Sequence, residues 1–140
     1  MLPYYKNALL LVSLTVAACG PAQQSEVAMV ALVANANEYD DRDVTTYGFL
    51  RKSKNVRLFL SREDAANNND YHSIIFNNLS AAEIDEIGKC NNQYVYVSGT
   101  FKLKTNGLVF TNITHMKGQP EKPYSKLVCN HNFNRTQNHE

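Results

Sequence analysis

The segment Tyr94–Phe101, YVYVSGTF, alternates between two sets of side chains, and this alternation restricts the fold more than any other feature. Successive side chains of a β-strand point to opposite faces. One face is therefore expected to carry Val95, Val97, Gly99 and Phe101. Val44–Arg51 repeats the pattern, and its apolar face would carry Val44, Thr46, Gly48 and Leu50. These two alternating segments predict a chain that is mainly β. Their apolar faces are expected to be buried against another layer.

Shorter apolar runs and turn residues predict the remaining elements. Further strands are expected at 56–60, 73–76 and 108–116, with a hairpin signal at Asn106-Gly107 before the last of them. A first helix is expected at 25–34, with Ser25 as its N-cap. The sequence Ser80-Ala81-Ala82-Glu83 matches a capping box, which predicts a second helix that runs to about Ile87.

The expected order is one N-terminal helix, three strands, a second helix and two strands. This is the order of an OB-fold, a five-stranded, partly open barrel with a helix between strands three and four. Gly48 lies inside a predicted strand, where glycine often marks a bulge or a tight bend. The predicted fold class is therefore mainly β with short helices and an OB-like barrel.

Residues 1–20, MLPYYKNALLLVSLTVAACG, combine one basic residue, a short apolar run and small residues before Cys19. The apolar run is too short to span a membrane and fits the core of a secretory signal. The Val-Ala-Ala-Cys ending resembles the lipobox of bacterial lipoproteins, in which cleavage precedes the cysteine and the cysteine is lipidated. The other interpretation is an ordinary signal peptide with a chance cysteine near its cleavage site.

On the lipoprotein interpretation, residues 1–18 are a cleaved signal and 19–25 form a tether anchored to the membrane through Cys19. Gly20 implies, by resemblance to lipoprotein sorting, an outer-membrane location facing the periplasm. Residues 26–129 would form the OB-like domain and 130–140 a polar tail. The net charge of +1 provides no strong field to attract nucleic acid or an anionic surface.

Cys90 and Cys129 remain as an even pair in an exported chain, and export favours oxidation. A disulfide between them is predicted, and two free buried thiols are the alternative. The bond would close a loop of about 40 residues and contribute roughly 4 kcal/mol in the chain-entropy model.

Four segments carry a more specific resemblance: VALVANANEYDDRDVTTYGFLRK, LFLSRED, YVYVSGTFK and NGLVFTNIT. With them the chain resembles a group of small exported bacterial lipoproteins of OB-like fold, a group with no established activity. The resemblance covers about residues 28–116 and includes Gly48 and Gly99. It implies the fold and the envelope location, and it supplies no functional residues.

The sequence carries no nucleophile elbow, Walker loop or zinc-protease motif, so a non-enzymatic protein without a cofactor is expected. Cys90, Cys129, His131 and His139 match no standard zinc spacing. The acidic stretch 38–43 lacks the glycine and the late glutamate of an EF-hand loop. No metal site is predicted.

Aromatic and basic side chains are expected on the outer faces of the first, second and fourth strands. We call this set the aromatic–basic surface: Tyr47, Phe49, Arg51, Arg57, Phe59, Tyr94 and Tyr96. It predicts a non-catalytic binding module for an envelope protein, a glycan or a small ligand. The alternatives are a structural or stress-related lipoprotein whose aromatics pack under the 25–34 helix, and a barrel that binds single-stranded nucleic acid or oligosaccharide.

Overall fold

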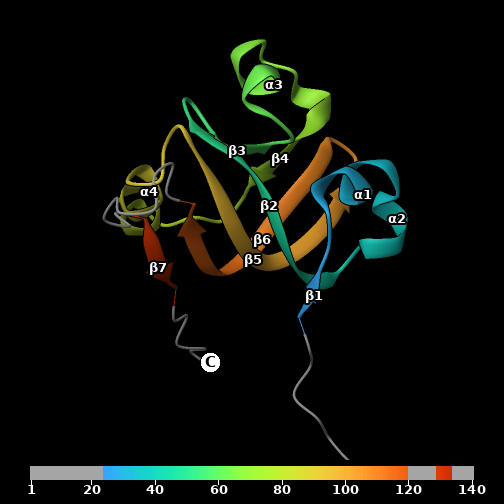
Figure 1. Cartoon of the computed structure of the whole chain (residues 1–140). Helices are drawn as coiled ribbons and strands as arrows, with labels where there is room; N and C mark the ends of the chain where they lie inside the picture. Colours follow the sequence, from blue (N-terminus) through green and yellow to red (C-terminus); the bar gives the residue numbers. More distant parts are fainter. Residues whose placement is uncertain (1–23, 120–128, 134–140) are drawn as a thin grey trace, which may run out of the picture.

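The computed structural model describes residues 24–119 and 129–133. Seven strands, four short α-helices and one 3-10 helix form this part of the chain (Figure 1). The strands are β1 (Ser25–Glu26), β2 (Arg42–Lys52), β3 (Val56–Phe59), β4 (Ser73–Phe76), β5 (Gln93–Lys104), β6 (Gly107–Gly118) and β7 (Asn130–Asn132). The helices are α1 (Met29–Ala34), α2 (Ala36–Tyr39), α3 (Arg62–Ala66), η1 (Asp70–His72) and α4 (Ala81–Gly88). The prediction of a mainly β chain with short helices is confirmed.

The strands form one sheet that closes into a ring. The order is β1-β2-β3-β4-β6-β5, and β5 pairs with β2 to complete the circle. The β2–β5 contact is long and antiparallel, and it runs from Arg42 opposite Phe101 to Leu50 opposite Gln93. The β4–β6 contact is parallel and short, with only Ile75 opposite Val109 and Phe76 opposite Phe110. The β2–β5 edge of the ring is therefore closed by a long antiparallel ladder, and the β4–β6 edge by a short parallel one.

The inner faces of the ring form the core, as the alternation predicts. Val44, Leu50, Val95, Val97 and Phe101 are all at most 1% exposed. The helix α4 lies between β4 and β5 in the chain, and its capping box between Ser80 and Glu83 is formed. Ile87 of α4 belongs to the same core cluster. The helix predicted from the capping box is therefore present between β4 and β5.

The N-terminal region differs from the predicted single helix over 25–34. Ser25 and Glu26 pair with Val44 and Thr45 as a parallel strand, so Ser25 is not a helix cap. The helix α1 begins only at Met29, and Ala28 precedes it without a side-chain cap. A two-residue strand carries no detectable period, which is why the pattern of apolar residues did not separate it from the helix.

Two strand glycines have different roles. The register between β5 and β6 shifts between Ser98 and Thr100, where Gly99 alone faces residues 112–114, so Gly99 lies opposite a bulge in β6. Gly48 instead allows close packing: a Cβ there would lie 2.8 Å from atoms of Leu58, Met29 and Phe59.

The sheet also extends beyond residue 129, the predicted end of the domain, because Asn130–Asn132 pair with β6 as β7.

Candidate functional site

The structure separates the seven residues of the aromatic–basic surface into three places. Tyr47, Tyr94 and Tyr96 stack on the outer face of β2 and β5. Phe49 and Phe59 are buried beneath α3. Arg51 and Arg57 lie on β2 and β3 and line two different hollows. The seven residues therefore do not form one continuous surface.

Phe49 and Phe59 are only 5% and 3% exposed, and they form a second small core with Ala65 of α3. Tyr94 packs against this core, with its ring 5.2 Å from that of Phe49 in an edge-to-face arrangement. The prediction that both phenylalanines face outward to a partner is corrected by this burial. The covering element is α3, and not the N-terminal helix that the packing alternative named.

The tyrosines form a ladder because the β2–β5 register places Tyr47 opposite Tyr96. The ring of Tyr47 lies 5.3 Å from that of Tyr94 and 4.9 Å from that of Tyr96. Partial burial, followed by the neighbouring Tyr94 and Tyr96, raises the pKa of Tyr47 above its ordinary value of 10.0. Tyr96 is 38% exposed, so the ladder reaches solvent at one end.

Arg57 lines a groove with a volume of about 1180 Å³, which we call the Arg57 groove. Its walls come from four parts of the chain that the ring brings together: α1 and α2, the η1 helix, β3 and β4, and the β5–β6 hairpin (Figure 1). Val33, Ile75, Leu108 and Val109 supply apolar surface. Tyr71 lies at the groove and is 90% exposed.

A hydrogen-bonded triangle holds Arg57 in this groove. A guanidinium N–H of Arg57 donates to the Ser73 hydroxyl at 2.9 Å, and the same nitrogen lies 3.5 Å from a carboxylate oxygen of Asp70. The Ser73 hydroxyl in turn donates to the Asp70 carbonyl at 2.8 Å. The positive charge of Arg57 is thus partly balanced by Asp70. The other polar side chains that line the groove are the uncharged Asn37, Asn77, Thr105 and Asn106 and the cation Lys104.

Arg51 lines a smaller hollow of about 500 Å³ between α3, the β2–β3 turn and the α4–β5 loop, which we call the α3 cleft. Its guanidinium donates to the Ala65 carbonyl. Arg62 lies over the ring of Phe49, with 5.4 Å between the guanidinium carbon and the ring centre. The lining also includes Lys52, Ser53, Asn91 and Asn92, and no described lining residue is acidic.

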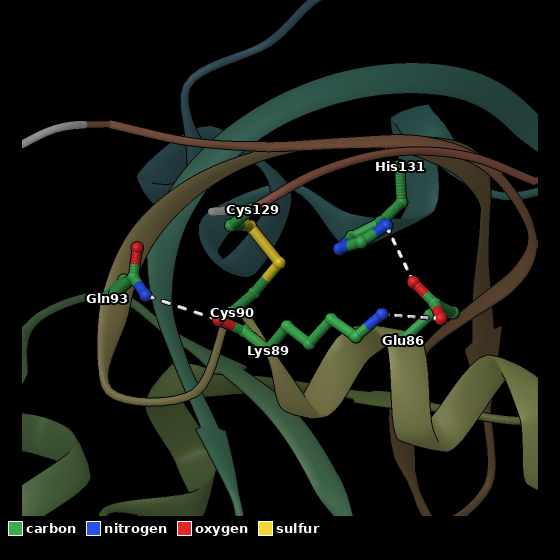
Figure 2. Close-up of a disulfide and its surroundings, with 6 residues drawn as sticks. All are labelled: Glu86, Lys89, Cys90, Gln93, Cys129 and His131. Carbon is green, nitrogen blue, oxygen red and sulfur yellow. Dashed lines mark hydrogen bonds and ion pairs between the residues drawn. A yellow bond between two sulfur atoms is a disulfide. The ribbon is translucent and has the colours of Figure 1, made fainter. Parts of the chain in front are cut away.

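The predicted disulfide is present, with Cys90 and Cys129 joined and their Cα atoms 5.0 Å apart. Figure 2 shows that the bond links the end of α4 to the start of β7. Next to it, Glu86 of α4 contacts Lys89 at 2.7 Å and His131 of β7 at 3.0 Å. The hydrogen bond from Lys89, more than the charges of Lys89 and His131, lowers the pKa of Glu86. The disulfide and the ion pair together fasten β7 to α4.

Asp64 is the centre of a polar cluster that joins α3 to η1. Its carboxylate accepts from the Ser61 hydroxyl at 2.7 Å and contacts His72 Nδ1 and the Asn69 amide, each at 2.9 Å. These contacts, led by Ser61 and then His72, lower the pKa of Asp64. Because Ser61 bonds to the carboxylate and not to His72, the cluster lacks the relay of a serine nucleophile.

Within residues 24–119 and 129–133, no three His, Cys, Asp or Glu side chains come together as a metal site. In the same part of the chain, no helix has the length and hydrophobicity needed to cross a membrane. Cys19 and His139 lie outside the described residues, as do the predicted signal and most of the tether.

Sequence reasoning missed Tyr71, Arg62 and the tip of the β5–β6 hairpin as lining residues. Tyr71 follows a run of asparagines, and no period marks it. The hairpin was predicted from Asn106-Gly107, but its position beside α1 depends on the closure of the ring. Searches against protein-family models and against curated proteins find no match.

Proposed function

We propose that this chain is a non-catalytic binding module of the bacterial cell envelope, anchored by lipid on Cys19. The signal-like segment before Cys19 and the lipobox resemblance support the anchor. The disulfide between Cys90 and Cys129 is consistent with an oxidising compartment. The outer membrane, facing the periplasm, is the proposed location.

We infer further that the ring is an OB-like barrel. The five longest of the described strands, β2 to β6, follow the predicted order, α4 intervenes between the third and fourth of them, and the third and fifth pair in parallel. In OB-folds the face of strands two and three, with the loops near it, is a common place for oligosaccharides and oligonucleotides. Here those strands are β3 and β4, and they line the Arg57 groove.

The observation that carries the proposal is the Arg57 groove. Ligand sites are concave and combine apolar walls with a few polar groups, and drug-sized ligands fill about 300–1,000 Å³. A groove of about 1180 Å³ has room for a ligand larger than that class. Asn37, Asn77 and Asn106 present amides that donate and accept, which suits hydroxyl groups. With Arg57 paired to Asp70, we propose a neutral oligosaccharide as the ligand.

Tyr71 supplies the test of this proposal. Its exposed ring would pack against the apolar face of a sugar ring, as aromatic rings pack against other apolar groups. The experiment titrates the full chain with soluble oligosaccharides released from bacterial cell wall and follows binding by calorimetry. Tyr71→Ala is expected to weaken binding by about tenfold or more, and Tyr71→Phe to preserve it because the ring remains.

Tyr96→Ala is the matched control, because Tyr96 is an exposed aromatic on the tyrosine ladder and does not line the groove. Tyr71→Ala should leave the thermal stability near that of the wild type, and Tyr96→Ala should lower it slightly because it removes one ring contact with Tyr47. Equal affinity in Tyr71→Ala and wild type, or no binding of any cell-wall oligosaccharide, would contradict the proposal. Binding of a single-stranded oligonucleotide in place of the oligosaccharides, with an affinity that falls steeply with salt, would indicate a nucleic-acid site instead.

A further inference from the structure

The floor of the Arg57 groove carries a small apolar spot. Side chains alternate along β4, and Ile74 and Phe76 belong to the core, so Ile75 faces outward and lines the groove. The sheet register places Arg57 of β3 on one side of Ile75 and Val109 of β6 on the other. Because Ile75 is half-buried and Val109 is only 4% exposed, the apolar surface that they offer a ligand is small.

Two asparagines that line the groove have side-chain amides free to bind a ligand. Asn77 lies two residues after Ile75, directly beyond the end of β4, and Asn37 belongs to α2. The backbone N–H of Asn77 donates to the Phe110 carbonyl at 3.0 Å, which fixes the main chain beside the apolar spot. Within the part of the chain that the structure describes, neither side-chain amide has a hydrogen-bond partner. Each amide can therefore donate and accept without giving up a contact in the fold.

An acetamido group presents three features that these residues can match. Its methyl is apolar, its carbonyl accepts hydrogen bonds and its N–H donates one. The N–H and the C=O of a trans amide point in opposite directions, so they need partners on two sides. Asn77 and Asn37 come from different elements of the groove, the end of β4 and α2. A hydroxyl group has no methyl and would leave the apolar spot of Ile75 and Val109 uncovered.

We infer that the Arg57 groove selects oligosaccharides whose sugars carry acetamido groups. The methyl of one such group packs on Ile75 and Val109, and its amide atoms bind Asn77 and Asn37. This inference rests on the proposed function, because it names the class of oligosaccharide that the same groove would hold. A site built to hydrogen-bond a particular group discriminates against an analogue that lacks it, since the polar atoms of the site are then covered without a partner. The preference is therefore expected to follow the acetamido group and not the sugar ring.

Calorimetric titration of the full chain, held in micelles of a neutral detergent without a sugar headgroup, tests the inference. The probes are the tetramer of N-acetylglucosamine and cellotetraose, which share backbone and linkage and differ only in the acetamido group that replaces one hydroxyl on each sugar. Both probes are neutral, so Arg57 and Lys104 do not distinguish them by charge. The acetylated tetramer is expected to bind at least about tenfold more tightly.

Two variants test the assigned contacts. Asn77→Ala removes an amide that makes no side-chain hydrogen bond within the described residues, and it is expected to lower the affinity for the acetylated tetramer about tenfold and that for cellotetraose little. Ile75→Thr removes apolar surface and keeps a β-branched residue in the strand, so it should reduce the same preference. The matched control is Asn130→Ala, because Asn130 is an exposed asparagine of β7 that does not line the groove. It should leave both affinities unchanged.

Three results would overturn the inference. Equal affinity for the two tetramers would mean that the groove does not recognise the acetamido group, while the proposed function would stand. A preference that persists in both Asn77→Ala and Ile75→Thr would place the acetamido contact elsewhere. Binding of neither tetramer would count against this inference and the proposed function together. Because Tyr71 is expected to pack on a sugar ring, Tyr71→Ala should weaken both tetramers alike, which separates the two proposals.

Discussion

Tyr47 and Phe49 lie on the same face of β2, two positions apart, yet one reaches toward solvent and the other is buried. The difference arises because Ala65 of α3 packs against Phe49, whereas among the described residues the ring contacts of Tyr47 are with Tyr94 and Tyr96. Strand alternation correctly assigned both side chains to the outer face. It could not reveal that a five-residue helix covers part of that face, because such coverage is a property of the loop path.

Gly48 shows the opposite situation, in which a residue without a side chain is fixed by its surroundings. Gly48→Ala would place a Cβ 2.8 Å from Leu58, Met29 and the Phe59 carbonyl. Overpacking of this kind costs about 1–3 kcal/mol of the free energy of unfolding. Urea denaturation of the full chain measures the change.

Gly88→Ala is the control for the Gly48 variant. Its Cβ would meet only the flexible end of Lys52, and alanine is the better helix former by about 1 kcal/mol. No loss of stability is expected at this position. Equal destabilisation by both substitutions would mean that the close packing at Gly48 is not the cause.

At the scale of elements, polar side-chain contacts stabilise the short helix α3 and link it to η1. The α3 helix has five residues, too few to be stable alone. Ser61 caps it by accepting the N–H of Asp64, and the carboxylate of Asp64 reaches His72 in η1. The link to His72 could not be predicted from the sequence, because it joins residues whose approach depends on the loop between them.

Asp64→Asn tests this link through the pH dependence of stability. The pKa of Asp64 is lowered in the folded chain, so the ionised carboxylate stabilises the fold above its ordinary pKa of about 4. That stabilisation is lost as the pH falls toward and through the lowered value. Asp64→Asn should therefore lower the urea midpoint near neutral pH, and the difference from wild type should shrink in acid.

Asp85→Asn on α4 serves as the comparison for the loss of one negative charge at an exposed position. The measurement is the urea midpoint of wild type and both variants across the acid range. A difference between Asp64→Asn and wild type that is the same at neutral and acid pH would contradict a role for the carboxylate charge.

At the scale of the whole molecule, the order of β2 to β6 and α4 along the chain could be predicted, and the Arg57 groove could not. Alternation at 44–51 and 94–101, the capping box at Ser80 and the even pair of cysteines predicted the strands, α4 and the disulfide. The Arg57 groove is formed where α1, η1 and the β5–β6 hairpin meet. No local pattern encodes a meeting of segments so far apart in the chain. The strand β7 was missed for a simpler reason, since Asn130–Asn132 has no apolar face.

Cys19→Ala addresses the proposed anchor of the whole molecule. The substitution removes the thiol that lipid would modify, so the chain should shift from the membrane fraction to the soluble fraction, and incorporation of labelled palmitate should disappear. Fractionation and labelling in a bacterial host measure both effects. Cys90→Ser is the control for loss of a cysteine and should retain the label. Labelled palmitate in Cys19→Ala would refute the lipid assignment.

The closure of the ring also sets when folding can finish. The bond between Thr45 and Ser98 joins residues 53 positions apart, and β2 has only its neighbours β1 and β3 until β5 has been made. Non-local pairing of this kind is slow, because a long loop must close before the contacts stabilise it. When the N-terminus of the chain emerges first, the sheet therefore stays open at the β2–β5 edge until β5 follows. For the export that we propose, such late closure would let the chain pass a narrow channel unfolded and complete its sheet on the far side.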